Sequence, residues 1–482
     1  MRTPASIRRF LRTALPVLGC ATLPGCGGKS TFVDLQIRGA TSTPMPGIKR
    51  LVVTLDLGGK AAETELSEKD GRDIQLPTSA SFEVRSGAGA LNVSVSAQDA
   101  AGIERDHGTA SGNVAAGDTT QVDVQMQGAA RQATLTVRRI GVGVGRIVST
   151  PAGIDCGAVC SAPFDVNTPV TLTATTDFTS SVSGWSSPSC AGSTCPVVAS
   201  SDQTVTVSFN CDFRWVVDAG GTDANAGGCA APFKTITKAL GLAAAGDSVA
   251  VRPGLYDAPG NGESFPLAVP AGVALVGDEP GKGNGAAATT IFGGGAVSSP
   301  SVTTALHPAA SATVAGFTIT CAGGTSCAGI LPQGNAVTIR NNTITGNATY
   351  GIEVANSTTN HVIVGNVIEN SGTAGIGYVQ TSAGGKAERN LIRKNQRGVE
   401  YDTAGGDLGG GPSGSAGGNV LSCNTQNDVW TSQTIALSLR DNQWDHAPPA
   451  QSCSAGGDLC STSLLPATFD AAGATVAASP CP

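Results

Sequence analysis

A short phrase that recurs at a fixed interval constrains this chain more than any other feature. Asn342-Thr343-Ile344, Asn366-Val367-Ile368 and Asn390-Leu391-Ile392 each begin 24 residues after the last. A second phrase, which begins at Gly351, Gly375 and Gly398, keeps step with the first. No apolar residues recur at helical spacing over ten residues, so the period indicates one coil of a β-solenoid rather than a pair of helices.

Stacked coils bring equivalent residues together at the strand spacing of ~4.8 Å. We therefore expect Asn342, Asn366 and Asn390 to occupy one corner, where each side chain bonds to its copies and the asparagine itself takes a left-handed backbone. The isoleucine two places after each asparagine should point inward, together with Ile352, Ile376 and Val399. Such a core needs few aromatic residues, and they make up 4% of this chain.

The start of the sequence is typical of an export signal. Four arginines precede a short apolar stretch, residues 14–23, that is too brief to span a bilayer. Two neighbouring segments, residues 17–20 and 23–26, resemble a bacterial lipoprotein box and end at Cys20 and Cys26. We predict a signal peptide over residues 1–25, lipidation of Cys26 in preference to Cys20, and a tether over residues 26–30, while an ordinary cleaved signal remains the alternative.

Cysteine parity favours Cys26. The chain has 14 Cys, and removal of Cys20 with lipidation of Cys26 leaves an even number for pairing in an oxidising compartment. Their spacing predicts local bridges within Cys156/Cys160 and Cys190/Cys195, and a bridge from Cys211 to Cys229. The remaining candidates are Cys321 and Cys327, and then Cys423, Cys453, Cys460 and Cys481, which the sequence assigns to two bridges of open pairing.

Composition agrees with a secreted all-β protein. There are 65 Gly, 13% charged residues and a net charge of −7, with no basic run that would suggest nucleic acid as a partner. Changes of texture predict three domains. The first, residues 31–128, has well-separated β runs and reads as a small antiparallel sandwich with a solvated His107. The second covers residues 132–210 and the third residues 212–482.

The second domain resembles the divergent bacterial surface repeat related to the internalin B-repeat. The resemblance rests on the Pro-Ala-Gly-Ile-Asp-Cys phrase at residues 151–156 and the Gly-Trp pair at residues 184–185, with strand-like runs around them. It implies a small β module. The glycine-rich run at residues 141–145 has no following helix, so a phosphate-binding loop is excluded.

The third domain resembles the bacterial family of domains of unknown function numbered 1565. The residues that carry the resemblance lie in four phrases, at 231–240, 246–256, 265–273 and 275–278. The resemblance implies a right-handed parallel β-helix of the pectin-lyase-like superfamily and no established activity. Phe233, Ile236 and Leu240 lie at helical spacing, so we expect an amphipathic helix that starts at Pro232, ends before Gly246 and caps the first coil.

One pair of carboxylates on the solenoid is a candidate for chemistry. If Ile352, Ile376 and Val399 point inward, Glu353 and Glu400 point outward on either side of Gly377, two coils or ~9–10 Å apart. That separation is near the one at which inverting glycosidases hold their acid and base. The other interpretation is a solvated polar face, which the absence of pectate lyase and polygalacturonase phrases favours.

Basic residues accompany this pair in the adjoining corner: Arg393, Lys394 and Arg397. If chemistry lies elsewhere, the Gly/Ser-rich insertion around Asp402 and Asp407 is the next place to expect it. His307, His361 and His446 are dispersed along the sequence without metal-ligand spacing.

A loop near the start of the third domain offers oxygen atoms. Asp218, Asp223 and Asn225 could hold a calcium ion or form a tight turn. No other cofactor is expected. Together these features predict a lipoprotein of the outer membrane or cell surface, anchored to the membrane by its lipid. Its β-helix binds polysaccharide or a surface protein without catalysis, and a polysaccharide lyase or glycoside hydrolase is the alternative.

Overall fold

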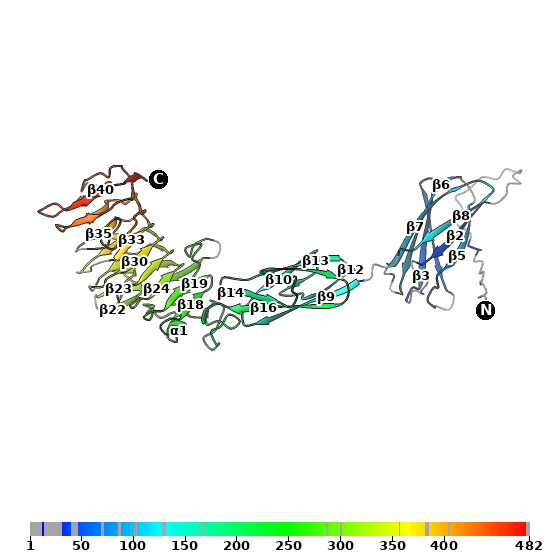
Figure 1. Cartoon of the computed structure of the whole chain (residues 1–482), viewed down its shortest axis with the longest axis horizontal. Coiled ribbons are helices and arrows are strands. Elements are labelled where there is room, and N and C mark those ends of the chain that lie inside the picture. Colours follow the sequence, from blue (N-terminus) through cyan, green and yellow to red (C-terminus); the bar gives the residue numbers. More distant parts are fainter. Residues whose placement is uncertain are drawn as a thin grey trace. The chain divides into compact units, whose positions relative to one another are not determined.

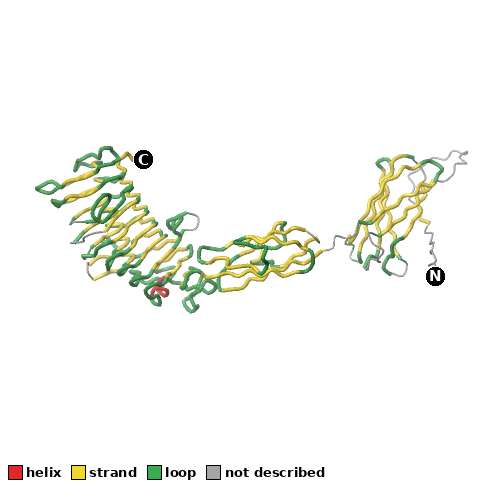
Figure 2. The backbone as a smooth tube through the Cα atoms, viewed as in Figure 1, coloured by secondary structure: helices red, strands yellow, loops and turns green. Residues whose placement is uncertain are grey.

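A computed structural model describes most of the chain. The described residues are 12–13, 31–39, 47–68, 72–84, 88–100, 102, 104–127, 132–165, 168–285, 288–298, 301–355, 357–380, 385–402 and 405–478. Strands dominate throughout, as Figures 1 and 2 show. Cys20, Cys26 and Cys481 fall outside these ranges, as does the predicted signal and tether except for residues 12–13.

The chain divides into two compact units. The first comprises residues 1–135, 162–169 and 198–203, and the second comprises residues 136–161, 170–197 and 204–482. Among the described residues, no helix has the length and apolar character needed to cross a membrane.

The N-terminal module is a β-sandwich of two four-stranded sheets, with strand orders β1-β5-β2-β8 and β4-β3-β6-β7. Its strands are β1 (Arg12–Thr13), β2 (Thr31–Arg38), β3 (Arg50–Leu57), β4 (Lys60–Ser67), β5 (Thr78–Val84), β6 (Gly89–Gln98), β7 (Glu104–Val114) and β8 (Thr119–Gln125). Alternate residues, such as Val33, Leu35 and Ile37 of β2, are fully buried and form the core. The sequence therefore predicts this sandwich correctly.

Two details of the module differ from the prediction. β2 pairs with β8 in parallel, so the sandwich is not wholly antiparallel. β4 and β7 were not expected as strands because they lie at the edges of their sheet and carry mostly polar, exposed residues. On β7 the buried positions include Asp106 and Gly108, so the strand lacks the apolar alternation by which strands are recognised. The His107 side chain on β7 is 53% exposed.

The following module also consists of two four-stranded sheets, with strand orders β11-β10-β13-β15 and β12-β9-β16-β14. Its strands are β9 (Gln132–Gly141), β10 (Arg146–Thr150), β11 (Asp155–Cys156), β12 (Ser161–Asp165), β13 (Thr168–Thr175), β14 (Ser180–Trp185), β15 (Thr194–Ala199) and β16 (Gln203–Cys211). The disulfides Cys156–Cys160 and Cys190–Cys195 each close a local loop, with the pairing that their spacing predicts.

The rest of the chain is a parallel β-helix built from three long sheets. Sheet I contains β17 (Trp215–Val217), β18 (Ser248–Val251), β20 (Ala274–Val276), β24 (Thr313–Ala315), β27 (Thr338–Arg340), β30 (His361–Val364) and β33 (Gly385–Glu388). Sheet II contains β19 (Gly254–Asp257), β21 (Thr289–Phe292), β25 (Thr318–Thr320), β28 (Thr343–Thr345), β31 (Val367–Glu369), β34 (Leu391–Arg393), β36 (Val420–Ser422), β39 (Gln443–Trp444) and β42 (Thr475–Val476).

Sheet III contains β22 (Gly295–Ser298), β23 (Ser301–Leu306), β26 (Cys327–Ile330), β29 (Tyr350–Val354), β32 (Ala374–Tyr378), β35 (Arg397–Tyr401), β37 (Asn427–Thr431) and β40 (Gly457–Ser461). A two-stranded sheet of β38 (Ala436–Ser438) and β41 (Thr468–Asp470) follows near the C-terminus. In sheet II, Ile344 pairs with Ile368 and Ile368 with Ile392, so the sequence period is one coil. These residues are fully buried in one continuous core.

Asn342, Asn366 and Asn390 stack at one corner between sheets I and II. The Asn342 amide donates to the Asn366 side-chain oxygen at 3.1 Å, and Asn366 to Asn390 at 3.0 Å. Asn419 and Asn442 continue the ladder. The left-handed residue is the one before each ladder asparagine, for example Gly365 with φ 68° and Arg389 with φ 54°. The expectation that the ladder asparagines themselves take this conformation was therefore wrong, because the preceding residue makes the turn.

A second ladder, which the sequence analysis missed, runs along the corner between sheets II and III. Its members are Asn347, Ser371, Asn395 and Asn424, and each of the last two accepts a backbone N–H from the coil before it. Their spacing repeats the period of the first ladder, so the signal was present in the sequence. Ser371 in place of asparagine concealed it.

The cap of the first coil is shorter than expected. α1 (Ile236–Leu240) begins after its N-cap Thr235 and ends at Gly241, so Pro232 and Phe233 precede the helix. Phe233 instead forms a strand-like bridge with Val217 and is buried. The Glu263 carboxylate accepts the N–H groups of Ile236 and Thr237 at the start of α1. Ile236, Ala239 and Leu240 still cover the solenoid core, as the sequence predicts for a capping helix.

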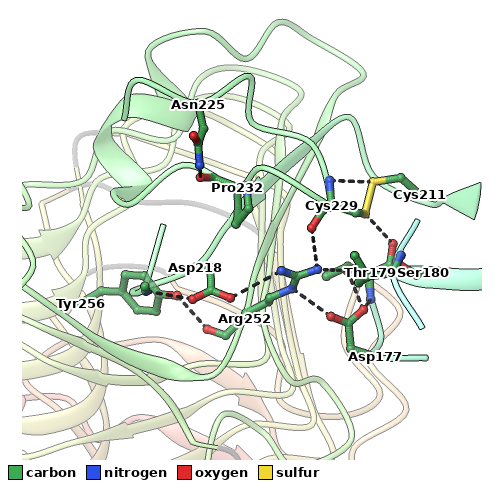
Figure 3. Close-up of polar contacts among 12 residues, drawn as sticks. Asp177, Thr179, Ser180, Cys211, Asp218, Asn225, Cys229, Pro232, Arg252 and Tyr256 are labelled. Carbon is green, nitrogen blue, oxygen red and sulfur yellow. Dashed lines mark hydrogen bonds and ion pairs between the residues drawn. A yellow bond between two sulfur atoms is a disulfide. The ribbon is translucent and has the colours of Figure 1, made fainter. Parts of the chain in front are cut away.

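Arg252 links the start of the solenoid to the preceding strands of the same compact unit (Figure 3). Its guanidinium pairs with Asp177 at 2.9 Å and Asp218 at 3.5 Å, and donates to the Thr179 hydroxyl at 3.1 Å. The Cys211–Cys229 disulfide lies beside it, with the predicted pairing. Arg252 thus neutralises two carboxylates where the two β architectures meet.

Candidate functional site

The candidate site lies on the outer face of sheet III. The strand register stacks Glu353 on Gly377, Gly377 on Glu400 and Glu400 on Trp430. The neighbouring positions Ile352, Ile376 and Val399 are fully buried in the core, so strand alternation directs the glutamates outward. The geometry expected from the sequence therefore holds for this column, which we call the outer column (Glu353, Gly377, Glu400 and Trp430).

The outer column is not a solvated face. Glu353 is 4% exposed and Glu400 is 5% exposed. A Cβ added at Gly377 would lie 2.5 Å from the Tyr350 ring, so this ring occupies the space that the glycine leaves. Tyr350 also packs against an outer apolar cluster that contains Leu331, Ala355 and Val379. The interpretation as a solvated polar face was wrong. Both glutamates are almost fully buried, and Tyr350 of β29 covers Gly377 of the next coil.

Arg397 covers the other end of the outer column. Its guanidinium lies 3.0 Å from the Glu400 carboxylate and 3.9 Å above the centre of the Trp430 ring. Both contacts favour a charged guanidinium, the first by Coulomb attraction and the second through the electrons of the ring. Trp430 itself is only partly buried. Arg397 is thus held between a carboxylate and an indole that still meets solvent.

The two carboxyl groups have different electrostatic surroundings. Burial raises the pKa of Glu353 to about 7. Burial also raises the pKa of Glu400, but the charge and hydrogen bond of Arg397 oppose this effect. Near neutral pH the Glu353 carboxyl therefore exists in both protonation states, whereas Glu400 has a cationic partner that stabilises its ionised form.

The other basic residues predicted nearby have different contacts. Arg393 pairs with Glu369 on sheet II at 2.9 Å, and Lys394 forms a left-handed corner with φ 58°. Asp407 lies in the Gly/Ser-rich insertion, which was the alternative place expected for chemistry. It is buried, and its carboxylate accepts the N–H groups of Gly409, Gly411 and Ser415. Its carboxylate shapes that loop.

In the loop considered for calcium, Asp218, Asp223 and Asn225 each make separate contacts within the protein. Asp218 accepts the Gly220 N–H and faces Arg252, whereas Asn225 donates to the Pro232 carbonyl, as Figure 3 shows. Asp223 accepts the N–H groups of Lys234 and Thr235 ahead of α1. These contacts are those of the tight-turn alternative.

The cysteines of the solenoid form further bridges. Cys321 pairs with Cys327, and Cys453 with Cys460, which resolves part of the pairing that the sequence left open. Cys423 is also disulfide-bonded. The five bridges placed among the described residues indicate an oxidising, extracytoplasmic compartment.

Tyr350 and Trp430 are the site residues that sequence reasoning missed. The sequence period assigns each residue its place in a coil, and Trp430 could have been aligned with Glu400 from it. The period does not state which side chains reach across to the next coil, so the cover that Tyr350 provides could not be predicted.

Comparison with known proteins identifies a family for the solenoid. Residues 219–451 match the family described as "Protein of unknown function (DUF1565)", which confirms the family expected for this domain. The comparison with curated proteins gave no match.

Several solved structures are similar to parts of the chain. A pectate lyase, Pel9A, is 13% identical with a TM-score of 0.34, and the match covers 55% of this chain and 78% of the lyase. A rhamnogalacturonan lyase is 12% identical with a TM-score of 0.25, and its match covers 55% of this chain and 62% of that chain. The minor pilin GBS52 of Streptococcus agalactiae is 10% identical with a TM-score of 0.20, over 37% of this chain and 95% of the pilin.

Proposed function

We propose that this protein is an exported envelope lipoprotein whose β-helix binds polysaccharide on the outer face of sheet III, without turnover. The observation that carries the proposal is the cover over the outer column. Glu353 and Glu400 are almost fully buried, and Arg397 already pairs with Glu400. A catalytic acid and base must reach the scissile bond within hydrogen-bond distance, and groups covered by the chain's own side chains do not.

Trp430 is the contact point that we assign to a sugar. Its indole is partly exposed and Arg397 fixes its orientation. A pyranose ring presents C–H groups that pack on an indole, while its hydroxyls bond to nearby polar groups. A rigid, oriented aromatic side chain loses little conformational entropy when it binds.

A glycan array probed with the exported full-length chain tests this proposal. Binding to at least one polysaccharide class is expected, and Trp430→Ala should weaken it by at least about tenfold, since central aromatic contacts contribute more than about 1.4 kcal/mol. The matched control is Phe292→Ala, which removes an exposed aromatic side chain from sheet II. A chain that binds no glycan, or a Trp430→Ala variant that binds as the parent does, would contradict the proposal and leave a protein partner as the ligand.

A lyase or hydrolase on the same column is the second candidate. The observation that favours it is the pKa of Glu353 near 7, next to a Glu400 that Arg397 supports in its ionised form. Enzymes separate the roles of acid and base in this way. We expect no turnover of acidic or neutral polysaccharides by the full chain. If turnover is measured, Glu353→Gln and Glu400→Gln must each abolish it for this column to be the active site.

A further inference from the structure

A column of glycines runs along sheet III beside the second ladder, and it ends in two aspartates. The strand register aligns Gly351, Gly375 and Gly398 with Asp428, and Asp428 with Asp458. A Cβ at Gly375 would lie 3.0 Å from the Asn395 amide, and one at Gly398 would lie 2.9 Å from the Asn424 amide. Each residue of this column therefore faces the ladder residue of the next coil.

The same geometry directs the aspartates toward a third acid. Asp445 follows Asn424 by one coil, and its carboxylate accepts the N–H of Cys423 at 2.8 Å at the second ladder's corner. In the earlier coils, a glycine of this column faces the amide of a ladder asparagine. In this coil, Asp428 faces the carboxylate of Asp445 instead. One ligand oxygen from each of Asp428, Asp445 and Asp458 lies within 4.8 Å of the others. Within the described ranges, no other group of three acidic, histidine or cysteine side chains meets this condition.

Two of these carboxylates have an oxygen without a partner. Asp428 is 2% exposed and Asp458 is 1% exposed. The Asn424 amide donates to Oδ1 of Asp428 at 2.7 Å, whereas its Oδ2 has no hydrogen-bond partner. Oδ2 of Asp458 accepts the Ala450 N–H and lies 3.0 Å from Nδ1 of His446, whereas its Oδ1 has no hydrogen-bond partner. A buried polar oxygen without a partner is costly, so these two oxygens must be satisfied either by a bound cation or by a proton.

We propose that Asp428, Asp445 and Asp458 together bind one Ca²⁺ ion at the C-terminal end of the β-helix. The ligand atoms are all carboxylate oxygens, which hard cations prefer. Mg²⁺ is usually held by one or two carboxylates and keeps several waters, whereas Ca²⁺ commonly takes several protein carboxylates. A set of three carboxylates therefore favours Ca²⁺. The ion joins two successive coils, because Asp428 comes from one coil and Asp445 and Asp458 come from the next.

The competing state is a set of shared protons. Burial raises the pKa of Asp428 well above its usual range, and the adjacent Asp445 and Asp458 add to this effect. A proton held between two carboxylates would also satisfy the free oxygens. The two states differ in an observable way, because only one of them contains a metal.

Metal content and thermal unfolding of the exported full-length chain decide between them. The protein is stripped with EDTA, dialysed, and titrated with CaCl₂ at constant ionic strength up to about 5 mM, above the range of about 0.1–1 mM in which extracellular calcium modules bind. We expect one Ca²⁺ per chain by elemental analysis and a rise in Tm of several degrees. An unchanged Tm and no bound calcium would overturn the proposal in favour of shared protons.

Variants locate the ion. Asp428→Asn and Asp458→Asn keep the shape of the side chain and should each abolish the calcium-dependent rise in Tm. Asp470→Asn is the matched control, because Asp470 lies near the same end of the solenoid in an exposed pair with Arg440, and it should keep the full rise. Calcium binding that survives both cluster substitutions would overturn the proposal, as would an equal rise with MgCl₂. If a variant does not fold, the metal content of the parent chain still decides.

Discussion

Glu353 carries its side chain away from the solenoid core and still loses almost all contact with water. Its pKa in the folded chain is about 7, against an ordinary value of 4.5, and burial is the cause. Because the folded value is the higher one, the contribution of this group to stability is complete below pH 4.5 and is lost as the pH rises through 7. The loss amounts to about 3 kcal/mol.

Glu353→Gln removes this titration while keeping the shape of the side chain. We expect the variant to be more stable than the parent at pH 8 by up to about 3 kcal/mol, and nearly equal at pH 4.5. Urea unfolding at the two pH values measures the difference. Glu369→Gln, which breaks an ion pair on sheet II and leaves Glu353 intact, should preserve the parent's pH dependence. A Glu353→Gln variant with that same dependence would show that the carboxyl is solvated.

Gly377 is required by the ring that covers it. A methyl group there would meet Tyr350 atoms at 2.5 Å, so Gly377→Ala should destabilise the chain by about 1–3 kcal/mol. Alanine in a strand normally stabilises relative to glycine, so the sign of the change is diagnostic. Gly228→Ala is the control, because nothing lies within 4 Å of its added Cβ. In a Tyr350→Ala background the penalty at Gly377 should disappear; if it remains, the ring is not its cause.

Side-chain hydrogen bonds at the corners of the coils stabilise this fold, in addition to the backbone hydrogen bonds between its strands. Asn366 is fully buried, donates to Asn390 and the Ile339 carbonyl, and accepts from the Asn342 N–H. Asn366→Ala leaves several of these groups without partners and should lower the unfolding free energy by about 3 kcal/mol or more. Denaturant unfolding measures it. Asn370→Gly, which removes an exposed amide at a neighbouring corner, should cost far less. Equal losses would mean that the ladder adds nothing beyond a local turn.

The sequence predicts elements well where coils repeat and poorly where they do not. The repeat identifies the inward isoleucines and the first ladder, because stacked positions share one environment. It misses α1's true start, since Phe233 has helical spacing to Ile236 yet bonds as a strand. It also misses the cluster of Asp428, Asp445 and Asp458, because these residues depart from the repeat. The metal site that we propose lies where the repeat breaks, so a search for the period does not find it.

At the scale of the whole molecule, export to an oxidising compartment would allow the cysteines to form disulfides. We predict that the exported protein begins at a lipidated Cys26 and contains six disulfides without a free thiol. Intact mass and peptide mapping, before and after reduction, check both parts. The five observed bridges and the bonded Cys423 agree with the second part. A diacyl group on Cys20, or any alkylated cysteine in the unreduced sample, would contradict the parity argument.

The Gly/Ser-rich insertion has a consequence for how this architecture can change. Between Asn390 and Asn419 the coil is 29 residues long instead of 24, yet β34 pairs with β36 and β35 with β37 in unbroken register. Sheet I alone ends at β33. Beyond it, single β-bridges pair Lys386 with Asp407 and Gly409 with Leu439. One flank of the solenoid can therefore gain or lose residues while the other two stay aligned. A peptide tag inserted at the exposed residues 412–414 should therefore leave the strand pairing of sheets II and III intact.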